Sequence, residues 1–368
     1  MGFKIISVVG ARPNFIKIAP IDKAFQAYDS IQHIICHTGQ HFDPSMSKVF
    51  FEELNIPKPA FNLGVSGGSH AHQTAAIMTA FEEVLLYEKP DLVIVPGDVN
   101  STLAASLVAA KLQIPVAHVE AGLRSYDRRM PEEINRIIAD QLSDLLFVTE
   151  QSGIDNLAIE GIDQKKIFFT GNVMIDSLVS HKPLIDRSKV RNRFNLDTNE
   201  YILCTFHRPS NVDDPVQLKA LIALLNELSG MIKVVLPMHP RTKQNMESNG
   251  LLSTIHPGII QTEPLGYIDF LALTKDARLL LTDSGGIQEE TTFLKIPCIT
   301  VRDNTERPIT CTLGTNTLVG TNFDNVRLVV LKSLKEKNIE GEIPPLWDGN
   351  AAIRICQIID NYLNSKLL

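Results

Sequence analysis

Two acidic side chains in this sequence stand where buried strands are predicted to end. Asp98 closes the apolar stretch 91–98, and Glu120 closes the stretch 115–120. Paired carboxylates in a partly dry site can have separated pKa values, so that one serves as a base and the other as an acid. The structural alternatives are that Asp98 caps the next helix and that Glu120 orders its loop. We favour a catalytic role for both.

A glycine turn at 284–286 predicts a site for an anion. Three leucines at 279–281 indicate a strand, and residues 287–294 indicate a helix. A strand, a turn of Ser284, Gly285 and Gly286, and a helix would direct backbone N–H groups at a phosphate. Glu289 and Glu290 are expected in the first helical turn. They would either contact a ribose or sugar hydroxyl or only complement the helix dipole, and this stretch alone does not decide between the two.

Basic residues near the amino terminus indicate a second place for phosphate. Arg12 follows the predicted strand 4–9, and Lys17 lies one turn into the helix that comes next. Two cations beside the positive end of a helix suit a phosphate or diphosphate, and ordinary surface charge is the alternative. The motif G-x-G-x-x-G of dinucleotide-binding proteins is missing here, so NAD is not expected.

Other polar residues stand at a helix start and at a strand end. Glu132 follows Pro131 at a predicted helix start and would project into a cleft, but an i, i+4 ion pair with Arg136 is the alternative. His207 ends the predicted strand 201–207 and could bind a phosphate oxygen or transfer a proton, unless it is a structural histidine. The histidines within 69–72 lack a third converging ligand, so no metal site is predicted.

The elements that must position these residues alternate between strand and helix. Such alternation, with strands apolar on both faces, predicts an α/β protein with two Rossmann-like, doubly wound parallel-sheet domains facing a cleft. Ligands of such sheets bind at the carboxyl ends of the strands, where the polar residues described above would lie. We predict an N-terminal domain over 1–172, which carries the carboxylates, and a C-terminal domain over 173–350, which carries the anion site. A final helix, 351–368, would pack back across the domain junction. The predicted strands are 4–9, 32–37, 91–98, 115–120, 145–149, 167–170, 201–207, 232–238, 258–260, 279–281 and 297–301.

Composition excludes several classes of protein. The 368 residues carry a net charge of −7, which argues against a nucleic-acid partner. No apolar run approaches the roughly 20 residues that span a bilayer, and the first residues show no signal-peptide pattern. The five cysteines are widely scattered, as is typical of buried thiols in a reducing cytosol. We therefore expect a cytoplasmic protein with no membrane partner.

Taken together, these residues form short motifs that resemble a known family. The motifs are GARPNFIK at 10–17, HTGQH at 37–41, PGD at 96–98, HVEAGLR at 118–124, PEEINR at 131–136, HR at 207–208, TDSGGIQEE at 282–290 and RDNTERP at 302–308. In this order they resemble the non-hydrolysing UDP-N-acetylglucosamine 2-epimerases, over nearly the whole chain.

The resemblance implies a fold similar to that of the GT-B glycosyltransferases and a reversible reaction. The family interconverts UDP-N-acetylglucosamine and UDP-N-acetylmannosamine for surface polysaccharides, without a cofactor and usually as a homodimer. The hydrogen on C2 has no adjacent carbonyl, so its direct removal would be difficult. Elimination of UDP to 2-acetamidoglucal and re-addition on the other face avoid that step, but they need acid and base groups and a stabilised diphosphate.

The resemblance also assigns roles to particular residues. It implies that Asp98, Glu120 and Glu132 are the catalytic carboxylates and that His207 is a candidate proton donor near the diphosphate. It places Glu290 on the ribose and Phe270 in the uracil pocket. The remaining candidates for contact with the substrate are Arg12, Lys17, Arg136, His239, Ser284, Gly285, Gly286 and Arg307.

Departures from the family pattern leave regulation and substrate open. Gln40 and Gln73 match positions near an effector site for UDP-N-acetylglucosamine in relatives, but Asn14 stands where many relatives have glutamate. Similar enzymes act on UDP-2,3-diacetamido-glucuronate, although Arg307-Pro308 favours the plain N-acetylglucosamine substrate. The alternatives from other classes are a retaining glycosyltransferase that uses a UDP-sugar and a nucleotide-sugar sensor without turnover.

Overall fold

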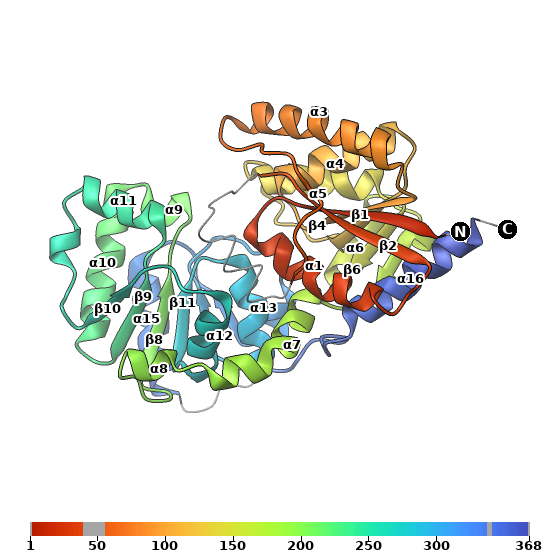
Figure 1. Cartoon of the computed structure of the whole chain (residues 1–368). Helices are drawn as coiled ribbons and strands as arrows, with labels where there is room; N and C mark the ends of the chain where they lie inside the picture. The colour runs from red at the N-terminus through yellow and green to blue at the C-terminus, as the bar shows by residue number, and fades with distance from the viewer. Residues whose placement is uncertain (1, 40–55, 337–340, 367–368) are drawn as a thin grey trace. The chain divides into compact units, whose positions relative to one another are not determined.

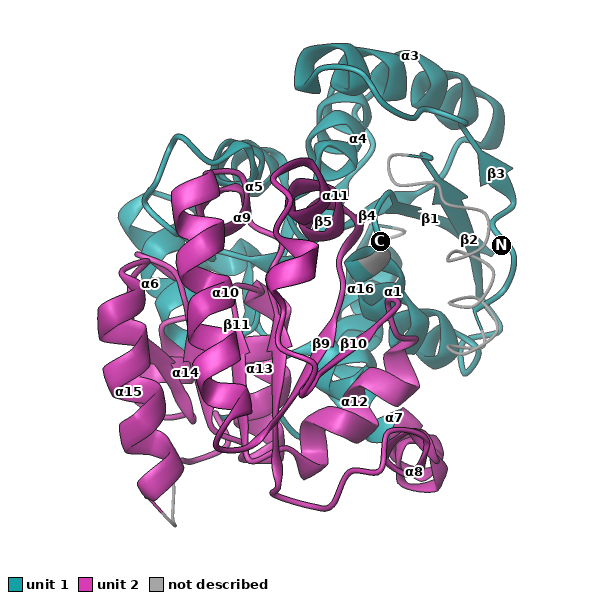
Figure 2. Ribbon diagram, turned by 90° about the vertical axis from the view of Figure 1, so that its left-hand side faces the viewer, with its two compact units in different colours: residues 1–180, 345–368 teal, residues 181–344 magenta. Residues whose placement is uncertain are grey.

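The computed structural model describes residues 2–39, 56–336 and 341–366 (Figure 1). Contacts between Cα positions divide the chain into two compact units, drawn in different colours in Figure 2. Unit 1 comprises residues 1–180 and 345–368, and unit 2 comprises residues 181–344. Each unit contains one parallel β-sheet with helices between its strands. The prediction of two parallel-sheet α/β domains is confirmed.

Unit 1 is built on a seven-stranded sheet of order β3-β2-β1-β4-β5-β6-β7, in which the paired strands are parallel. Its strands are β1 (Phe3–Val9), β2 (Ile31–His37), β3 (Phe61–Asn62), β4 (Leu92–Pro96), β5 (Val116–Ala121), β6 (Leu145–Val148) and β7 (Ile167–Phe169). Its helices are α1 (Arg12–Phe25), α3 (His70–Glu88), α4 (Asn100–Lys111), α5 (Pro131–Leu142), α6 (Gln151–Ile159), most of α7 (Val173–Arg187), α16 (Ala351–Ser365) and the 3₁₀ turn Gln164–Lys166.

Unit 2 repeats this plan with a six-stranded sheet of order β10-β9-β8-β11-β12-β13. Its strands are β8 (Tyr201–Thr205), β9 (Lys233–Pro237), β10 (Ile259–Thr262), β11 (Leu279–Thr282), β12 (Cys298–Thr300) and β13 (Asn316–Leu318). Its helices are α8 (Val190–Arg193), α9 (Pro209–Val212), α10 (Pro215–Ser229), α11 (Pro240–Ser248), α12 (Tyr267–Asp276), α13 (Gly285–Leu294), α14 (Ile309–Thr312), α15 (Phe323–Lys335) and the 3₁₀ turn Leu252–Thr254.

The central strands of unit 1 are apolar on both faces because both faces are covered. Side chains alternate between the two faces of a strand, yet the neighbours Ile5 and Ile6 of β1 are both fully buried. Ile6 belongs to a core cluster that also includes Val93 of β4, Phe81 of α3 and Ala105 of α4. Helices α3 and α4 lie side by side in Figure 1 and contact each other along their length.

Two short edge strands were missed by the sequence analysis. β3 has two residues and β13 has three, and both lie at an edge of their sheet. Each contains an asparagine and only one apolar residue, whereas β7 and β12, which are three residues long and were predicted, contain more. A helix predicted for residues 43–54 lies outside the described residues. Within the part of the chain that is described, no helix is long and apolar enough to cross a membrane.

The C-terminal segment belongs to the first unit. Helix α16 packs on α1, and the two lie together in Figure 1. The Asp176 carboxylate of α7 accepts hydrogen bonds from the backbone N–H groups of Ala351 and Ala352, at 3.1 and 2.6 Å, and so caps α16. The indole N–H of Trp347 donates to the Thr149 carbonyl. These contacts explain why unit 1 extends to residue 180 on α7. They also explain why the chain returns to unit 1 at residue 345, before the start of the predicted final helix at 351.

The Asp176 cap should make stability depend on pH. Burial raises the pKa of this carboxyl to about 6, although the two backbone N–H bonds act in the opposite direction. A group whose pKa is higher in the folded state than in the unfolded state binds its proton more tightly on folding. The free energy of unfolding should therefore rise relative to Asp176→Asn as pH falls from 7 to 4.5, by about 2 kcal/mol. Denaturant unfolding of both proteins at the two pH values measures this difference, and a constant difference would contradict the prediction.

Candidate active site

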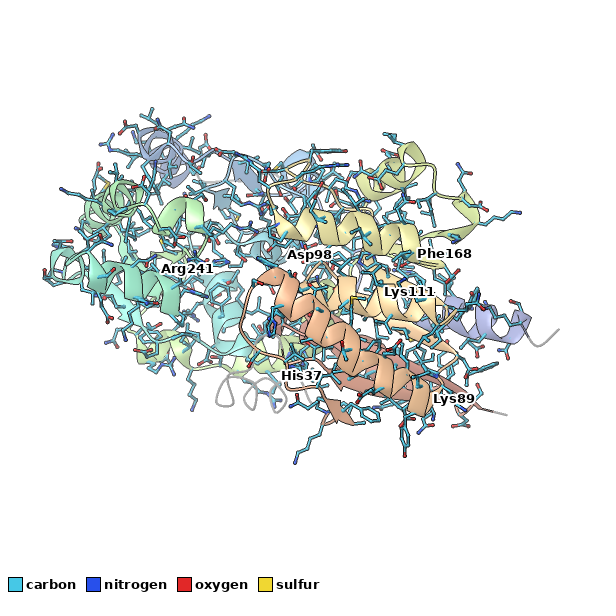
Figure 3. All side chains as sticks on the ribbon, turned by 90° about the horizontal axis from the view of Figure 1, so that it is seen from above. His37, Lys89, Asp98, Lys111, Phe168 and Arg241 are labelled. Carbon is cyan, nitrogen blue, oxygen red and sulfur yellow. The ribbon has the colours of Figure 1, made fainter. Side chains whose placement is uncertain are left out.

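The polar residues of unit 1 gather at the carboxyl end of its sheet. Figure 3 shows His37, which ends β2, and Asp98, which follows β4, at one end of the unit. Lys111, the last residue of α4, and Lys89, just after α3, lie at the other end, as expected for helices that run antiparallel to the strands. Ligands of parallel sheets bind at the end where Asp98 lies.

Asp98 forms an ion pair with Arg136 of α5. Its Oδ2 accepts from Nη2 of Arg136 at 2.7 Å and from Nε at 3.1 Å. The N-cap of α4 is Val99, not Asp98. Arg136 also donates to Glu133 Oε2 at 2.6 Å, one helical turn before it. Asp98 and Arg136, both predicted as site residues, are thus in direct contact.

The ion pair between Glu132 and Arg136, the structural alternative for Glu132, does not form. Glu132 is partly exposed and forms no hydrogen bond or ion pair with any described residue, whereas its neighbour Glu133 is buried and pairs with Arg136. Glu133 also accepts from the backbone N–H groups of Ser125 and Tyr126. Since i, i+3 and i, i+4 neighbours lie on the same helix face, sequence spacing alone could not choose between the two glutamates.

Glu120 forms a buried ion pair with Lys17 of α1. The two side chains are 4% and 6% exposed. Glu120 lies at a shift in the register between β5 and β6, and its φ of 74° is in the left-handed region. A residue without glycine's freedom adopts this conformation only under constraint, and such constraint is common at functional sites. A Cβ atom added to Gly97 would lie 2.8 Å from Nζ of Lys17, so Lys17 adjoins the residue before Asp98.

A buried polar network behind these carboxylates was missed by the sequence analysis. His118 of β5 lies between Asp140 of α5, at 2.6 Å, and the carbonyl oxygen of Gly97, at 2.8 Å. Asp140 also pairs with Arg124 at 2.7 Å and accepts from the Gly122 N–H group at 3.1 Å. The motif HVEAGLR contained His118, Gly122 and Arg124, but Asp140 lies outside every motif and had no sequence signal.

Gln73 of α3 is joined to the same region by side-chain amides. Its Oε1 accepts from Nδ2 of Asn100 at 2.7 Å, and Nδ2 of Asn135 donates to Oδ1 of Asn100 and to the backbone carbonyl of Asp98. Gln40, the other candidate for an effector site, lies outside the described residues. The side chain of Arg12 is also outside them, although its backbone begins α1.

In unit 2, His207 is held by a buried aspartate that the sequence analysis did not single out. Asp283 follows β11 and lies 2.9 Å from Nδ1 of His207. It accepts further hydrogen bonds from the backbone N–H groups of His207 and Arg208 and from Nδ2 of Asn211. Burial alone would raise the pKa of Asp283, but the hydrogen bond and the charge of His207 lower it. An ionised Asp283 therefore holds Nδ1 and leaves Nε2 of the half-exposed His207 ring for a ligand. The exposed His239 ring lies 5.3 Å away, centroid to centroid.

The glycine turn after β11 lies against a buried arginine and a buried glutamate. Helix α13 begins at Gly285 with Ser284 as its N-cap, and Ser284 and Gly286 are partly exposed. A Cβ atom on Gly285 would lie 2.8 Å from Glu306 and 2.9 Å from Arg307. Arg307 donates to Glu306 at 2.5 Å and pairs with Glu289 at 3.0 Å, so Glu289 now has a partner.

The prediction that both glutamates lie in the first turn of α13 is wrong. The helix begins at Gly285, earlier than the expected 287, because the two glycines are themselves helical. Glu289 and Glu290 therefore lie in the second turn, where the helix dipole has little effect. Glu290 is 4% exposed, and Phe270 of α12 is partly exposed. Among the described residues, no group of three or more His, Cys, Asp or Glu side chains could hold a metal ion.

Comparison with known proteins identifies the family. The family described as UDP-N-acetylglucosamine 2-epimerase matches residues 23–360. The UDP-N-acetylglucosamine 2-epimerase of Methanocaldococcus jannaschii is 43% identical over 364 residues, which cover 97% of this chain and 98% of that one. The UDP-2,3-diacetamido-2,3-dideoxy-D-glucuronate 2-epimerase of Pseudomonas aeruginosa is also 43% identical, over 97% of this chain and 99% of that one.

Solved structures of similar proteins point to the same family. The Methanocaldococcus jannaschii enzyme in complex with UDP-GlcNAc and UDP matches with a TM-score of 0.90 at 43% identity, over 98% of this chain and 100% of that one. The Neisseria meningitidis enzyme bound to UDP-GlcNAc matches with a TM-score of 0.88 at 32% identity, over 98% of this chain and 100% of that one. The two α/β units therefore have the GT-B-like fold of these enzymes, and the chain belongs to the UDP-N-acetylglucosamine 2-epimerase family.

Proposed function

We propose that this protein interconverts UDP-N-acetylglucosamine and UDP-N-acetylmannosamine by eliminating and re-adding UDP. The observation that carries the proposal is the pairing of two strand-end carboxylates with cations: Asp98 with Arg136, and Glu120 with Lys17. A reaction that moves a proton to and from C2 needs carboxylates held in defined positions. The family membership and the substrates of the relatives described above support the same reaction.

In the proposed elimination, a carboxylate removes the C2 proton and the C1–O bond to the diphosphate breaks. The electron pair of the C–H bond forms the C1=C2 double bond, and UDP leaves with its oxygen and the bonding pair. In the return step a proton is delivered to the opposite face of C2 while a diphosphate oxygen attacks C1. Asp98, Glu120 and the partly exposed Glu132 are the groups that we propose for these proton transfers. No cofactor takes part.

Residues of unit 2 are proposed to bind UDP. The backbone N–H groups at the start of α13 and the free Nε2 of His207 would bind the diphosphate as negative charge develops on it. Arg307 adjoins Gly285 and pairs with Glu306 and Glu289, and we propose that it also contacts the phosphates or the sugar. We propose that Glu290 binds the ribose and that Phe270 contacts the uracil. Arg12, Lys17, Arg136 and His239 remain proposed contacts of the phosphates or the sugar.

Incubation with UDP-N-acetylglucosamine alone in D₂O tests the reaction. Proton NMR should show UDP-N-acetylmannosamine and deuterium at C2 of both sugars. If neither appears, the epimerase proposal fails. Free N-acetylmannosamine together with UDP would indicate hydrolysis, and a glycosyltransferase would produce no epimer without an acceptor.

A second candidate substrate follows from the relative in Pseudomonas aeruginosa. That enzyme is named for UDP-2,3-diacetamido-2,3-dideoxy-D-glucuronate and is as similar to this chain as the Methanocaldococcus enzyme is. Rates with both UDP-sugars under equal conditions decide between them. We favour UDP-N-acetylglucosamine, since Arg307-Pro308 matches the enzymes that use it.

His207 and Asp283 should act as one unit. Asp283→Asn places an amide against N–H donors and removes the charge that holds Nδ1, so turnover should fall roughly 10²–10⁴-fold, as should that of His207→Asn. The double variant should be no slower than the slower single variant, because effects within one unit are not additive. Steady-state kinetics of the three variants measures this. Multiplicative losses would mean that the two residues act independently.

We further propose a cytoplasmic homodimer that supplies precursors for surface polysaccharides. Analytical ultracentrifugation tests the dimer. If UDP-N-acetylglucosamine activates the enzyme, turnover of UDP-N-acetylmannosamine alone should show a lag or be absent. Gln73→Ala should remove the effect of added UDP-N-acetylglucosamine on that turnover.

A further inference from the structure

His118 is buried in unit 1 between two hydrogen-bond partners, the Asp140 carboxylate and the Gly97 carbonyl. Its side chain has no exposed area, and its two ring nitrogens have different partners. Nε2 lies 2.8 Å from the backbone carbonyl oxygen of Gly97. A carbonyl oxygen can only accept a hydrogen bond, so Nε2 must carry a proton.

The partner of the other nitrogen is an ionised carboxylate. Nδ1 lies 2.6 Å from Oδ1 of Asp140, whose side chain is also fully buried. Oδ2 of Asp140 accepts from the Gly122 N–H group and pairs with Arg124, which in turn pairs with Glu160. Burial alone would raise the pKa of Asp140, but the charges and hydrogen bonds of His118 and Arg124 lower it. Arg124 and the Gly122 N–H group on Oδ2 stabilise the ionised carboxylate independently of the ring. Oδ1 then accepts a hydrogen bond from Nδ1, so this geometry requires a proton on both ring nitrogens.

His118 and Asp140 each contact the backbone close to a predicted catalytic carboxylate. His118 contacts it just before Asp98, and Asp140 contacts it just after Glu120. Gly97, which precedes Asp98, has a φ of 66°, and its N–H group donates to the Val119 carbonyl at 2.9 Å. Gly122, two residues after Glu120, is held by Asp140 at 3.1 Å. Since a peptide group is planar, fixing the Gly97 carbonyl also fixes the plane that leads into Asp98.

We propose that His118 is a positioning residue, a doubly protonated imidazole that holds the backbone at Asp98 and Glu120 in the geometry required for proton transfer. This inference rests on the proposed epimerase function. The charged groups that face the ring, directly or through Asp140, are Asp140, Arg124 and Glu160, and the two acids balance the two cations. Beside an ionised Asp140, a neutral ring would leave either the Gly97 carbonyl or Oδ1 of Asp140 without a donor.

His33 provides a matched control in the same unit. Its Nδ1 lies 2.7 Å from Asp22, and its side chain is 5% exposed, so it is another buried histidine–aspartate pair. Its Nε2 faces the Ser7 hydroxyl at 2.7 Å, which can either donate or accept, so this geometry does not require a second proton. None of its partners belongs to the site described above.

The charge is tested by NMR of the full chain labelled with ¹⁵N-histidine. The signals of His118, identified by their loss in His118→Gln, should show two protonated ring nitrogens from pH 6 to pH 8.5. An unprotonated ring nitrogen of His118 at neutral pH would overturn the proposal. If His118→Gln does not fold, the signal is assigned by elimination with single variants of the other nine of the ten histidines.

The positioning role is tested by kinetics. His118→Gln should lower kcat roughly 10- to 100-fold with little change in KM, because the carboxylates are displaced while the UDP-binding residues of unit 2 are unaltered. His33→Gln should keep kcat within about twofold of wild type, even if it unfolds at a lower temperature. Wild-type kcat in His118→Gln would overturn the role. If the wild-type protein does not epimerise, the proposed function fails, while the NMR experiment still decides the charge of His118.

Discussion

Asp98→Asn should abolish most epimerisation while leaving UDP binding within a few fold of wild type. The substitution keeps the shape of the side chain but removes the group that we propose to take up or deliver the C2 proton. Loss of a positioned acid or base costs roughly 10²–10⁴-fold in rate. The fold should tolerate the change, because Arg136 keeps its 2.6 Å hydrogen bond to Glu133.

Isotope exchange and calorimetry together measure this prediction. Deuterium incorporation at C2 in D₂O reports proton transfer, and titration with UDP reports binding. Asp155→Asn, which changes an exposed carboxylate on α6, is the matched control and should keep the wild-type rate. Wild-type turnover in Asp98→Asn would remove Asp98 from the mechanism, and loss of UDP binding would assign it a binding role.

Lys17→Met should strongly destabilise the protein, and a second substitution should reverse that effect. Glu120 and Lys17 are both almost fully buried, so removing the lysine leaves a carboxylate without its cation in the interior. Breaking a buried ion pair in this way costs about 3–5 kcal/mol. In the double variant Lys17→Met/Glu120→Gln no ion remains, and most of that loss should be recovered. Activity should not recover, because the proposed catalytic carboxylate is gone.

Denaturant unfolding of the two single variants and the double variant gives the coupling energy of the pair. Lys4→Met is the control, since the Lys4–Glu88 ion pair, at 2.7 Å, also joins a lysine to a glutamate but lies partly exposed. Its loss should cost less than about 1 kcal/mol. Additive effects of Lys17→Met and Glu120→Gln would mean that the ion pair does not exist in solution.

The interior of each sheet could be predicted from the sequence because its strands are covered on both faces. Runs such as 92–96 are apolar throughout, and the alternation with helices indicates parallel sheets. The edge strands β3 and β13 were missed, since each contains only one apolar residue. The start of α13 was placed too late because two glycines are poor helix formers in isolation. Here the packed turn beside Arg307 determines their conformation instead.

Residue types at strand ends sufficed to predict Asp98, Glu120, His207 and the glycine turn as site candidates. Their partners could not be predicted in the same way. Asp283 accepts from His207 across 76 residues of sequence, and Asp140 reaches His118 across 22. A single chain carries no local pattern for such contacts.

The sequence by itself determined the family, the class of fold and the positions that carry reactive side chains, because each of these depends on residue type and local spacing. Only the tertiary structure decided which charges are paired. It joins Arg136 to Asp98 and Glu133, Lys17 to Glu120, and Asp283 to His207. The physical reason is that a buried charge is stable only beside a partner, and which partner is within reach depends on how the strand ends and helices pack together.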